Sequence, residues 1–511
     1  MTKNLPFLLA CIVALMAISC SDELPSIVEE KKTEYTFEDL KDLVEKDLEQ
    51  GKTFDWREQE TEVIHSAGML SDSIFSIGYT IDDNFDIEGK MHQIDVKSEE
   101  WESAREILET MIVDMESKAR GEDVTMRDLR PFGEVKYFPQ IIISTASMEL
   151  LKALRAHDLV RFVEPIGFSI SDSYIANRSG SGCGGDPDYN LNSNDYTVVS
   201  PSGKVPWNFY NHQIDQAWNT SAKGNNIKMC VIDSGASDDQ DNLGSQFNSG
   251  NSFGRNIEKY STKYSGRWWW RSLDPPHDDC GHGTSMAGLA AAPWSNDGNA
   301  VGAAYQCDLM TIRAVSDVLI SNSDERSGVR DALYLAGGNS ATKVISMSIG
   351  TPFYSGTVAD GVFYAYNQQK LIFAAAGTSL SWTNWYPVIF PANMSQCRAV
   401  TGVQDSESLE ECVTCHTGSE VDFVLIMERQ VDTDRHSLGL ALYSNQPKYI
   451  GGSSAATATT AGIATMVWGE NPSASRAQVL DALKTASSIF PNRHPDFGWG
   501  LINAQQAVSN L

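Results

Sequence analysis

Basic residues are few in this chain. Lys and Arg number 39 against 67 Asp and Glu in 511 residues, so the formal net charge at pH 7 is −28. A chain with this balance is repelled by a phosphate backbone, and no nucleic acid partner is therefore expected. The charge favours a soluble protein outside the cytoplasm, and the length predicts two or three domains with a large core.

The pattern of a calcium-binding loop, D-x-D-x-D-G, is missing from the sequence. No metal site and no cofactor are therefore predicted from a motif. The many acidic loops leave calcium binding open as an alternative.

Cysteines are also few, and their number is odd once the N-terminus is set aside. Of nine cysteines, Cys11 and Cys20 lie in the first twenty residues, which leaves seven. An odd number in an oxidising compartment means at least one free thiol. Cys230 and Cys307 lie in apolar strand-like runs and are expected to be buried and inert. The remaining candidates for disulfides are Cys183, Cys280, Cys397, Cys412 and Cys415, and the sequence does not fix their pairing.

The N-terminus carries an export signal. Lys3 is followed by an apolar run over residues 5–18, which is too short to span a membrane in the mature protein. The sequence Ala17-Ile18-Ser19-Cys20 resembles the lipobox of bacterial lipoproteins, which implies cleavage before Cys20 and diacylation of its sulfur. We therefore expect an exported lipoprotein of the cell envelope, at the outer membrane or cell surface. An ordinary signal peptide is the alternative.

Three segments separate this signal (residues 1–19) from the C-terminal part of the chain. Residues 20–89 are an acidic tether followed by a stretch that we do not assign, with one helix expected over 37–48. Residues 90–170 have a β-α-β-β-α-β pattern, typical of a small open sheet with two helices. Strands are expected over 91–96, 134–138, 140–145 and 159–164, and helices over 98–115 and 147–156. Residues 171–205 are rich in Ser, Gly, Asn and Asp and are predicted to form an exposed linker where processing occurs.

From residue 206 to 511, apolar strands alternate with helices. Strands are expected over 227–232, 344–347, 371–375 and 399–403, and helices over 326–335, 358–368 and 475–485. This alternation predicts an α/β fold with a parallel sheet covered by helices on both faces. Functional residues of such sheets gather at the carboxyl ends of strands, where Asp233 and Gly377 lie.

A serine, a histidine and an aspartate occupy positions suited to catalysis. Ser454 lies in Gly452-Ser453-Ser454-Ala455-Ala456, a glycine-bounded turn that opens a helix of small residues. His282 lies between two glycines at the start of another such helix, and Asp233 ends an apolar strand. A serine attacks only when a base activates it, and histidine is the usual base. The order Asp, His, Ser is one of the known orders of a catalytic triad.

These motifs and three further blocks resemble the subtilisin-like serine protease family over about residues 206–511. The six blocks follow in register at residues 227–235, 279–289, 344–350, 372–377, 452–462 and 497–504. The resemblance implies the subtilisin-like fold and peptide-bond hydrolysis through an acyl-enzyme. Residues 90–170 resemble the propeptide that precedes many such domains, so the chain's own propeptide is an expected partner.

The resemblance also implies a role for each residue of the triad. Ser454 would be the nucleophile, with Ser453 as the neighbour most easily mistaken for it, and the alternative for Ser454 is a helix cap. His282 would be the general base, and His277 and His416 lie nearby in sequence but match no block. Asp233 would orient the imidazole, and its alternative is a turn-capping aspartate.

The oxyanion hole departs from the family pattern. After Ala375, Ala376 and Gly377 the family has asparagine, whose amide reaches the oxyanion, whereas this chain has Thr378. Thr378 together with the Ser454 backbone N–H, or with another group such as Asn384, would have to stabilise the charge; otherwise the enzyme is slow or inactive. A second departure is Ala458, where the family usually has proline.

Substrate would bind along two strands. Ser348, Ile349 and Gly350 would pair with the substrate backbone as an added strand. Ala375, Ala376 and Gly377 would form the opposite wall of the pocket for the side chain before the scissile bond. The alternative for both segments is an ordinary buried strand.

Two further motifs have competing interpretations. One motif is the run of three tryptophans, Trp268, Trp269 and Trp270. They could line a substrate or propeptide groove, but we favour the alternative that they pack an inserted loop onto the core. Cys412-Val413-Thr414-Cys415-His416 matches the haem-attachment pattern C-x-x-C-H, but a loop disulfide, to Cys397 for example, explains it better.

The sequence thus predicts a lipid-anchored serine endopeptidase zymogen whose partners are protein or peptide substrates, its own propeptide and, through the lipid, the membrane. One alternative is a catalytically weak or inactive pseudoprotease that binds peptides at the cell surface, which Thr378 favours. The other is a c-type haem protein.

Overall fold

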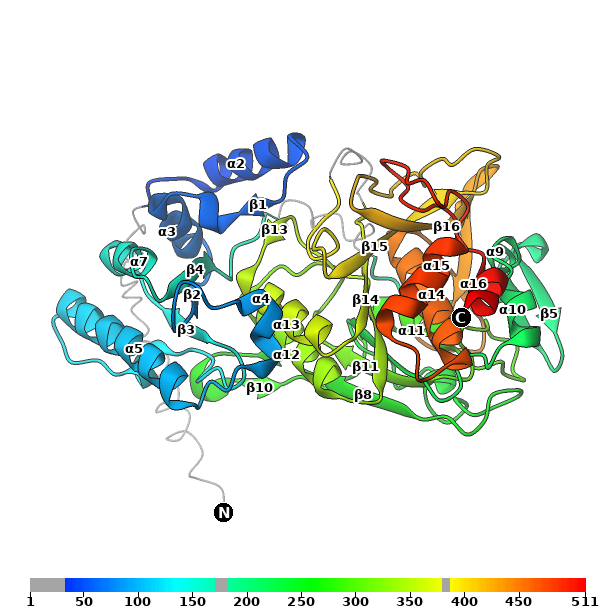
Figure 1. The fold of residues 1–511 in the computed structure, drawn as a ribbon, viewed down its shortest axis with the longest axis horizontal. Helices are drawn as coiled ribbons and strands as arrows, with labels where there is room; N and C mark the ends of the chain where they lie inside the picture. Colours follow the sequence, from blue (N-terminus) through cyan, green and yellow to red (C-terminus); the bar gives the residue numbers. More distant parts are fainter. Residues whose placement is uncertain (1–32, 171–181, 379–386) are drawn as a thin grey trace, which may run out of the picture. The chain divides into compact units, whose positions relative to one another are not determined.

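The computed structural model describes residues 33–170, 182–378 and 387–511 (Figure 1). The export signal, the predicted lipidation site Cys20 and Asn384 lie outside these residues. Residues 34–511 form one compact unit. Within the described ranges, no helix is both long and apolar enough to cross a membrane.

A nine-stranded sheet forms the centre of the C-terminal part, in the strand order β18-β17-β16-β15-β14-β12-β7-β11-β8. In this order, the seven strands that begin with β16 and end with β8 run parallel to one another. At the β16 edge, β17 and β18 extend the sheet as antiparallel strands. Their bounds are β7 (Lys228–Asp233), β8 (Ile257–Ser261), β11 (Asp308–Arg313), β12 (Thr342–Met347), β14 (Leu371–Ala375), β15 (Cys397–Gln404), β16 (Val421–Arg429), β17 (Asp432–Gly439) and β18 (Lys448–Ile450). The four strands expected from the sequence, β7, β12, β14 and β15, are confirmed.

Helices cover both faces of this sheet because alternate strand residues enter two separate cores. Ile232 of β7 packs in a cluster with α12 (Ser323–Gly338) and α13 (Gly356–Asn367). Its neighbour Val231 packs in a second cluster with α11 (His282–Ala291), α14 (Gly452–Glu470) and α15 (Arg476–Thr485). The shorter helices α9 (Trp207–Asn211), α10 (Ile214–Thr220) and α16 (Ala504–Asn510) join the second cluster. The subtilisin-like α/β fold class is thus confirmed.

The N-terminal part has a three-stranded antiparallel sheet in the order β3-β2-β4, with helices around it. Four elements match the prediction for residues 90–170: α5 (Glu99–Arg120), β3 (Gln140–Ser144), α7 (Met148–Arg155) and β4 (Val160–Pro165). The helix expected over 37–48 is α2 (Phe37–Glu49). The small helices are α4 (Ile87–Lys90) and α6 (Met126–Leu129). An α+β region therefore precedes the large sheet.

Two expected strands in this region are wrong. Residues 91–96 contain a 3₁₀ turn, Met91–Gln93, and residues 134–138 contain no strand. The central strand is instead β2 (Ile74–Tyr79), in the stretch that the sequence left unassigned. All six β2 residues are buried, so the strand lacks the alternation of apolar and polar residues that marks a half-exposed one. The helices α2 and α3 (Thr61–Met69) belong to the same folded region as β2, so this region starts before residue 90, within the stretch expected to be a tether.

The linker expected over 171–205 is also wrong where the structure describes it. Residues 182–205 include the hairpin strand β5 (Tyr196–Val199), which pairs with β6 (Gly203–Pro206). Asp195 is fully buried there and forms ion pairs with Arg429 (3.1 Å) and Arg435 (2.6 Å). The segment from residue 182 therefore belongs to the folded C-terminal domain.

The cysteines form two disulfides, Cys183–Cys280 and Cys412–Cys415. Cys230 and Cys307 are free and buried, as expected, but Cys397 is free as well and not the partner of a C-x-x-C cysteine. Burial raises the pKa of the Cys397 thiol to about 12, so this thiol is unreactive. Both sulfurs of the haem-like motif are consumed by the loop disulfide, which removes the attachment points for haem.

The three adjacent tryptophans lie on a small hairpin of β9 (Tyr264–Ser265) and β10 (Ser272–Leu273). Trp269 and Trp270 are 81% and 77% exposed, so the expected packing onto the core is wrong for both. Trp268 donates its backbone N–H to Pro131 O (3.0 Å) and faces the N-terminal region. In that region, β1 (Phe54–Asp55) likewise pairs with β13 (Phe353–Tyr354) of the C-terminal domain.

Candidate active site

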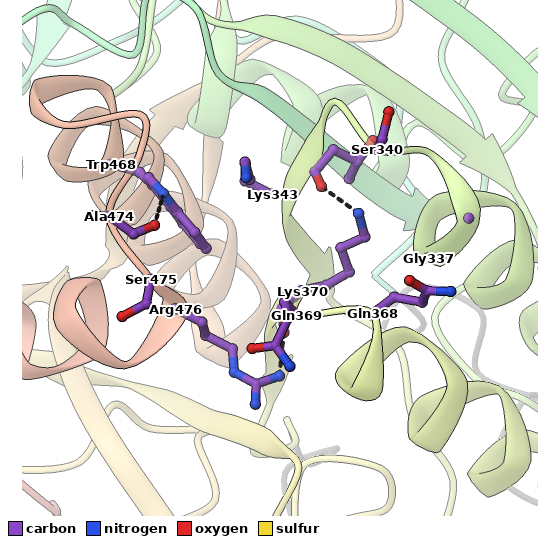
Figure 2. A pocket seen from close by; sticks show the side chains of 12 residues that line it. Gly337, Ser340, Lys343, Gln368, Gln369, Lys370, Trp468, Ala474, Ser475 and Arg476 are labelled. Carbon is purple, nitrogen blue, oxygen red and sulfur yellow. Dashed lines mark hydrogen bonds between the residues drawn. The ribbon is translucent and has the colours of Figure 1, made fainter. Parts of the chain in front are cut away.

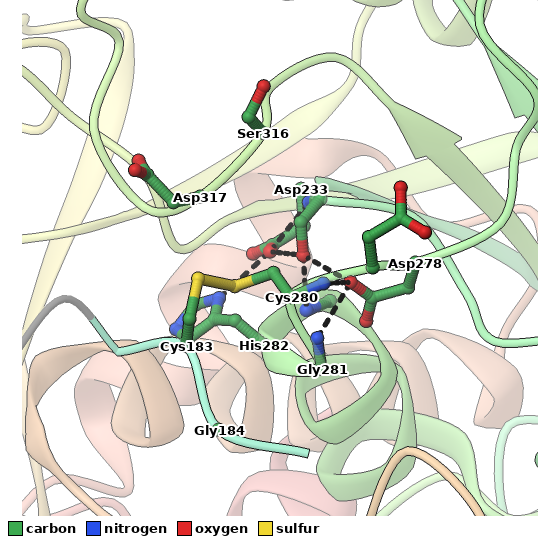
Figure 3. The surroundings of a disulfide bond; sticks show 12 residues. Cys183, Gly184, Asp233, Asp278, Cys280, Gly281, His282, Ser316 and Asp317 are labelled. Carbon is green, nitrogen blue, oxygen red and sulfur yellow. Dashed lines mark hydrogen bonds and ion pairs between the residues drawn. A yellow bond between two sulfur atoms is a disulfide. The ribbon is translucent and has the colours of Figure 1, made fainter. Parts of the chain in front are cut away.

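An aspartate and a histidine meet at the carboxyl end of β7. Asp233 ends the strand, and His282 is the first residue of α11. The His282 Nδ1–H donates to Asp233 Oδ1 at 2.8 Å, and the two residues are only 2% and 1% exposed (Figure 3). This bond orients the imidazole and leaves Nε2 as its acceptor, the arrangement that a general base requires.

Asp278 holds the histidine turn against the strand that carries Asp233. Its fully buried carboxylate accepts from Ser234 Oγ (2.9 Å) and from the backbone N–H groups of Cys280 (2.9 Å) and Gly281 (2.8 Å). The other oxygen accepts from Thr284 N (2.8 Å) and Thr284 Oγ1 (2.6 Å). The aspartate thus satisfies N–H groups at the start of α11, as an N-terminal cap does. Asp278 was not among the residues predicted from the sequence, although an acidic residue shortly before a helix start is a recognisable capping signal.

A disulfide lies on the other side of the same turn. Cys280 is bonded to Cys183, and Gly184 N donates to Cys280 O at 3.0 Å. A Cβ placed on Gly182 would come within 3.4 Å of the His282 ring, so this segment borders the imidazole. Figure 3 shows the disulfide beside the Asp233–His282 pair and Asp317 on the loop opposite. Burial raises the pKa of Asp317, and the charges of Glu325 and Asp233 act in the same direction.

Ser454 lies at the N-terminus of α14, as the third residue of that helix. Its hydroxyl donates to Ser348 O at 3.4 Å, and Ser348 Oγ donates to Ser454 O at 2.9 Å. No hydrogen bond joins Ser454 to His282 in the part of the chain that the structure describes, so the hydroxyl has to turn from Ser348 to reach the base. The Ser454 backbone N–H is among the first N–H groups of a helix, which lack intrahelical acceptors and can bind an anion.

The neighbouring Ser453 has a different environment. It is buried, whereas Ser454 is half-buried. The Gly377 N–H donates to Ser453 Oγ at 3.3 Å, and the same hydroxyl is 2.8 Å from Thr378 Oγ1. Ser453 therefore joins two segments of the fold, which leaves Ser454 as the serine open to a substrate.

Thr378 is exposed, and its hydroxyl contacts Ser453 at the start of α14. Besides the contact with the Ser453 hydroxyl, Thr378 Oγ1 accepts from Ser453 N at 3.3 Å. Gly377 before it has φ of +126°, and a Cβ there would lie 2.2 Å from the His416 ring, so only glycine fits. Ala458 is fully buried inside the continuous helix α14.

The two expected substrate walls are the ends of neighbouring strands, since Met347 of β12 pairs with Ala374 of β14. Ser348 and Ile349 follow β12 directly. Gly350 does not fit the predicted pairing in this structure, because its N–H donates to Val318 O (3.2 Å) and its carbonyl accepts from Ile320 N (2.9 Å). On the opposite wall, Ala375 ends β14 and the backbone of Ala376 is hydrogen-bonded on both sides, to Val400 O and Ile389 N (2.9 Å each).

The two alternative histidines have other surroundings. His277 Nδ1 accepts from the backbone N–H of Asp238 at 3.1 Å. His416 is buried against Gly377, and burial lowers its pKa to about 4. Of the three histidines, His282 has the hydrogen bond to Asp233.

A separate pocket of about 350 Å³ lies at the amino-terminal ends of β12 and β14, away from Asp233 (Figure 2). Lys343, Lys370 and Arg476 line it. Lys370 Nζ donates to Asn339 O and Thr342 O (2.7 Å each), and burial lowers its pKa to about 8. Arg476 donates to Tyr366 O near the end of α13, and Lys343 lies over the Trp468 ring, so these cations have structural partners and bring no nucleophile or base together. Among the described residues, no group of three or more His, Cys, Asp or Glu side chains could hold a metal ion.

Comparison with known proteins agrees with this geometry. The sequence model of the Subtilase family matches residues 224–500, more than half of the chain. The chain is 27% identical over 398 residues to the minor extracellular protease Epr of Bacillus subtilis, which covers 77% of this chain and 53% of Epr. It is 27% identical over 308 residues to subtilisin Savinase of Lederbergia lenta (60% of this chain, 98% of Savinase). It is 26% identical over 300 residues to thermitase of Thermoactinomyces vulgaris (58% and 93%). The chain thus spans about half the length of Epr and nearly all of Savinase and thermitase, and it belongs to the subtilase family.

Proposed function

We propose that this chain is a serine endopeptidase zymogen of the bacterial cell envelope that cuts peptide bonds with Asp233, His282 and Ser454. The observation that carries the proposal is the buried Asp233–His282 pair, 2.8 Å apart, in a subtilase whose α14 presents Ser454 at its N-terminus. An extracellular relative, Epr, supports export.

The chemistry follows from these positions. Ser454 Oγ attacks the carbonyl carbon of the scissile bond while His282 Nε2 takes its proton. The Ser454 backbone N–H stabilises the developing oxyanion, with the Thr378 hydroxyl as a second donor. His282 then gives the proton to the leaving amine, which leaves an acyl group on Ser454, and a water activated by His282 releases it. Asp233 holds the Nδ1–H throughout and stabilises the imidazolium.

The N-terminal region is proposed to be the propeptide, held by both polar and aromatic contacts. The buried carboxylate of Glu164 accepts from Gly356 N (2.8 Å), Thr357 N (2.9 Å) and Ser355 Oγ (2.9 Å), and so caps α13. Arg161 forms a forked pair with Asp360 of the same helix (3.0 and 2.8 Å). The region thus has its own sheet and docks on the catalytic domain through these charged groups at α13 and through buried aromatic contacts such as Trp56 stacked on Phe353.

The lipid on Cys20 is proposed to anchor the zymogen, and cleavage between about residues 165 and 205 to free the catalytic domain. Cys183 is bonded to Cys280, so a cut after residue 183 leaves both fragments joined until a reductant is added. A cut before it leaves the two fragments without a covalent link, so they separate under denaturing conditions without reductant. Electrophoresis of the wild type with and without reductant distinguishes the two.

The proposal is tested with Ser454→Ala. This variant should lose peptide hydrolysis and self-processing and stay membrane-bound at full length, while the wild type accumulates a soluble form that lacks residues 1 to about 170. Ser453→Ala is the matched control and should retain activity. Hydrolysis and processing by Ser454→Ala at the wild-type rate would contradict the proposal.

A weaker enzyme or peptide-binding pseudoprotease is the second candidate. The observation in its favour is that the Thr378 hydroxyl is 2.8 Å from Ser453 Oγ, a contact that competes with the oxyanion for this hydroxyl. A folded wild type that binds peptides but leaves them uncut would support this candidate.

A further inference from the structure

One side chain occupies the gap between the two substrate walls. The walls are the segments after β12 (Ser348 to Gly350) and at the end of β14 (Ala375 to Gly377). Ile389 lies between them, because its backbone N–H donates to Ala376 O on one wall at 2.9 Å and its side chain faces Gly350 on the other. Ile389 lies outside the six blocks that resemble the family, so its role could not be predicted from them.

The side chain fills the space beside Gly350 closely. A Cβ built on Gly350 would lie 2.4 Å from Ile389 Cδ1 and 2.9 Å from Cγ1, distances that no real Cβ adopts. The position that a larger substrate side chain would enter is therefore already taken by the end of Ile389. Ile389 itself is half-buried, so its side chain forms an accessible surface rather than a part of the core.

The backbone around Ile389 is held in place by hydrogen bonds and by the burial of its neighbours. Phe390 N donates to Thr351 O (3.1 Å), and Phe390 O accepts from Thr351 N (2.9 Å). Val388 and Phe390, the neighbours of Ile389, are fully buried. Isoleucine is also branched at Cβ and has few rotamers. The backbone at Ile389 therefore cannot move away without breaking these contacts, and the branched side chain has few other rotamers to adopt.

We propose that Ile389 restricts this protease to substrates with a small side chain, such as Gly, Ala or Ser, before the scissile bond. The inference rests on the proposed function, because it assigns the preference of the same pocket. A pocket rejects side chains that exceed it by one or two methylene-sized groups by roughly 10- to 200-fold in kcat/KM. Overpacking of a rigid site acts in the same direction.

The test compares wild type, Ile389→Ala and a matched control, Ile257→Ala, each expressed as the full chain and allowed to process itself. Ile257 is a half-buried isoleucine in the edge strand β8, which β7 and β11 separate from β12, the strand that leads to Ser348 beside Ser454. Peptides of one sequence carry Ala, Leu or Phe before the scissile bond. Wild type and Ile257→Ala should cut the Ala peptide at least tenfold better than the Phe peptide in kcat/KM. Ile389→Ala should raise kcat/KM for the Leu and Phe peptides by at least tenfold.

A binding measurement keeps the inference testable if turnover is absent. Product peptides that end in Ala or Phe are titrated against Ser454→Ala and against Ser454→Ala/Ile389→Ala. The inference is supported if Ser454→Ala binds the Ala peptide more tightly than the Phe peptide and Ile389→Ala removes or reverses this difference in affinity. This result does not require an active enzyme. A wild type that prefers Phe, or an Ile389→Ala variant with unchanged preference in both assays, would overturn the inference while leaving the proposed hydrolysis intact.

Discussion

Replacement of Asp278 by Asn is expected to loosen the histidine turn. The carboxylate accepts five hydrogen bonds, from Ser234, Cys280, Gly281 and twice from Thr284, and it donates none. An amide keeps the shape but puts an NH₂ group where one oxygen was. Because each of the two carboxylate oxygens accepts from at least one backbone N–H, the NH₂ group faces another donor in either orientation.

The less costly orientation directs the NH₂ group at Thr284, whose hydroxyl can turn to accept. The Thr284 backbone N–H then loses a bond to a charged acceptor, worth about 1.5–3 kcal/mol, and stays buried without a partner, at about 1–3 kcal/mol. Together these effects predict a loss of about 2.5–6 kcal/mol in the free energy of unfolding. The matched control is Asp279→Asn. Asp279 is 68% exposed and pairs with Arg313 at 2.8 Å, so its loss should cost less than about 1 kcal/mol.

Urea unfolding measures both variants in a Ser454→Ala background, so that self-processing does not change the chain. Kinetics in the wild-type background follow, because a shift of about 1 Å in His282 is expected to lower kcat roughly 100-fold. If Asp278→Asn unfolds at the same urea concentration as Asp279→Asn, the buried carboxylate does not hold the turn and the reasoning is refuted.

Two further predictions concern the oxyanion hole and pH. If Thr378 is an oxyanion donor, Thr378→Asn should raise or preserve kcat, and Thr378→Val should lower kcat about tenfold or more. An unchanged kcat in Thr378→Val would show that this side chain does not touch the oxyanion. His212 is neutral in the fold, since its Nδ1–H donates to Ile502 O (2.8 Å), Nε2 accepts from Ile426 N (2.9 Å), and burial lowers its pKa to about 4. The unfolded chain binds this proton near pH 6.5, so the free energy of unfolding should fall by about 3 kcal/mol as pH drops from about 6.5 to about 4. His212→Asn should flatten this dependence in urea titrations at pH 7.5, 6 and 5, and an equal slope in both proteins would count against it.

The sequence predicts best those features that a short pattern encodes. Strand β7 with Asp233 at its end, and the small-residue helices that begin at His282 and carry Ser454, follow from local apolar runs and glycine turns. The large sheet could be predicted because each of its central strands is an apolar run between helices.

Features that depend on distant contacts were not predictable. β2 is buried on both faces by elements from both sides along the chain, so its sequence has no strand period. The pairing of Cys183 with Cys280 joins residues 97 positions apart, and nothing in either segment encodes it. The same holds for Ile389, whose place between the walls follows from its hydrogen bond to Ala376.

The central claim is that His282 activates Ser454. A fluorophosphonate probe forms a covalent adduct only with an activated serine, and mass spectrometry of the digested protein locates the adduct. The account predicts an adduct on Ser454 in the wild type and in the control His277→Ala, and its loss in a folded His282→Ala variant. An adduct on Ser453, or equal labelling of Ser454 without His282, would contradict the account.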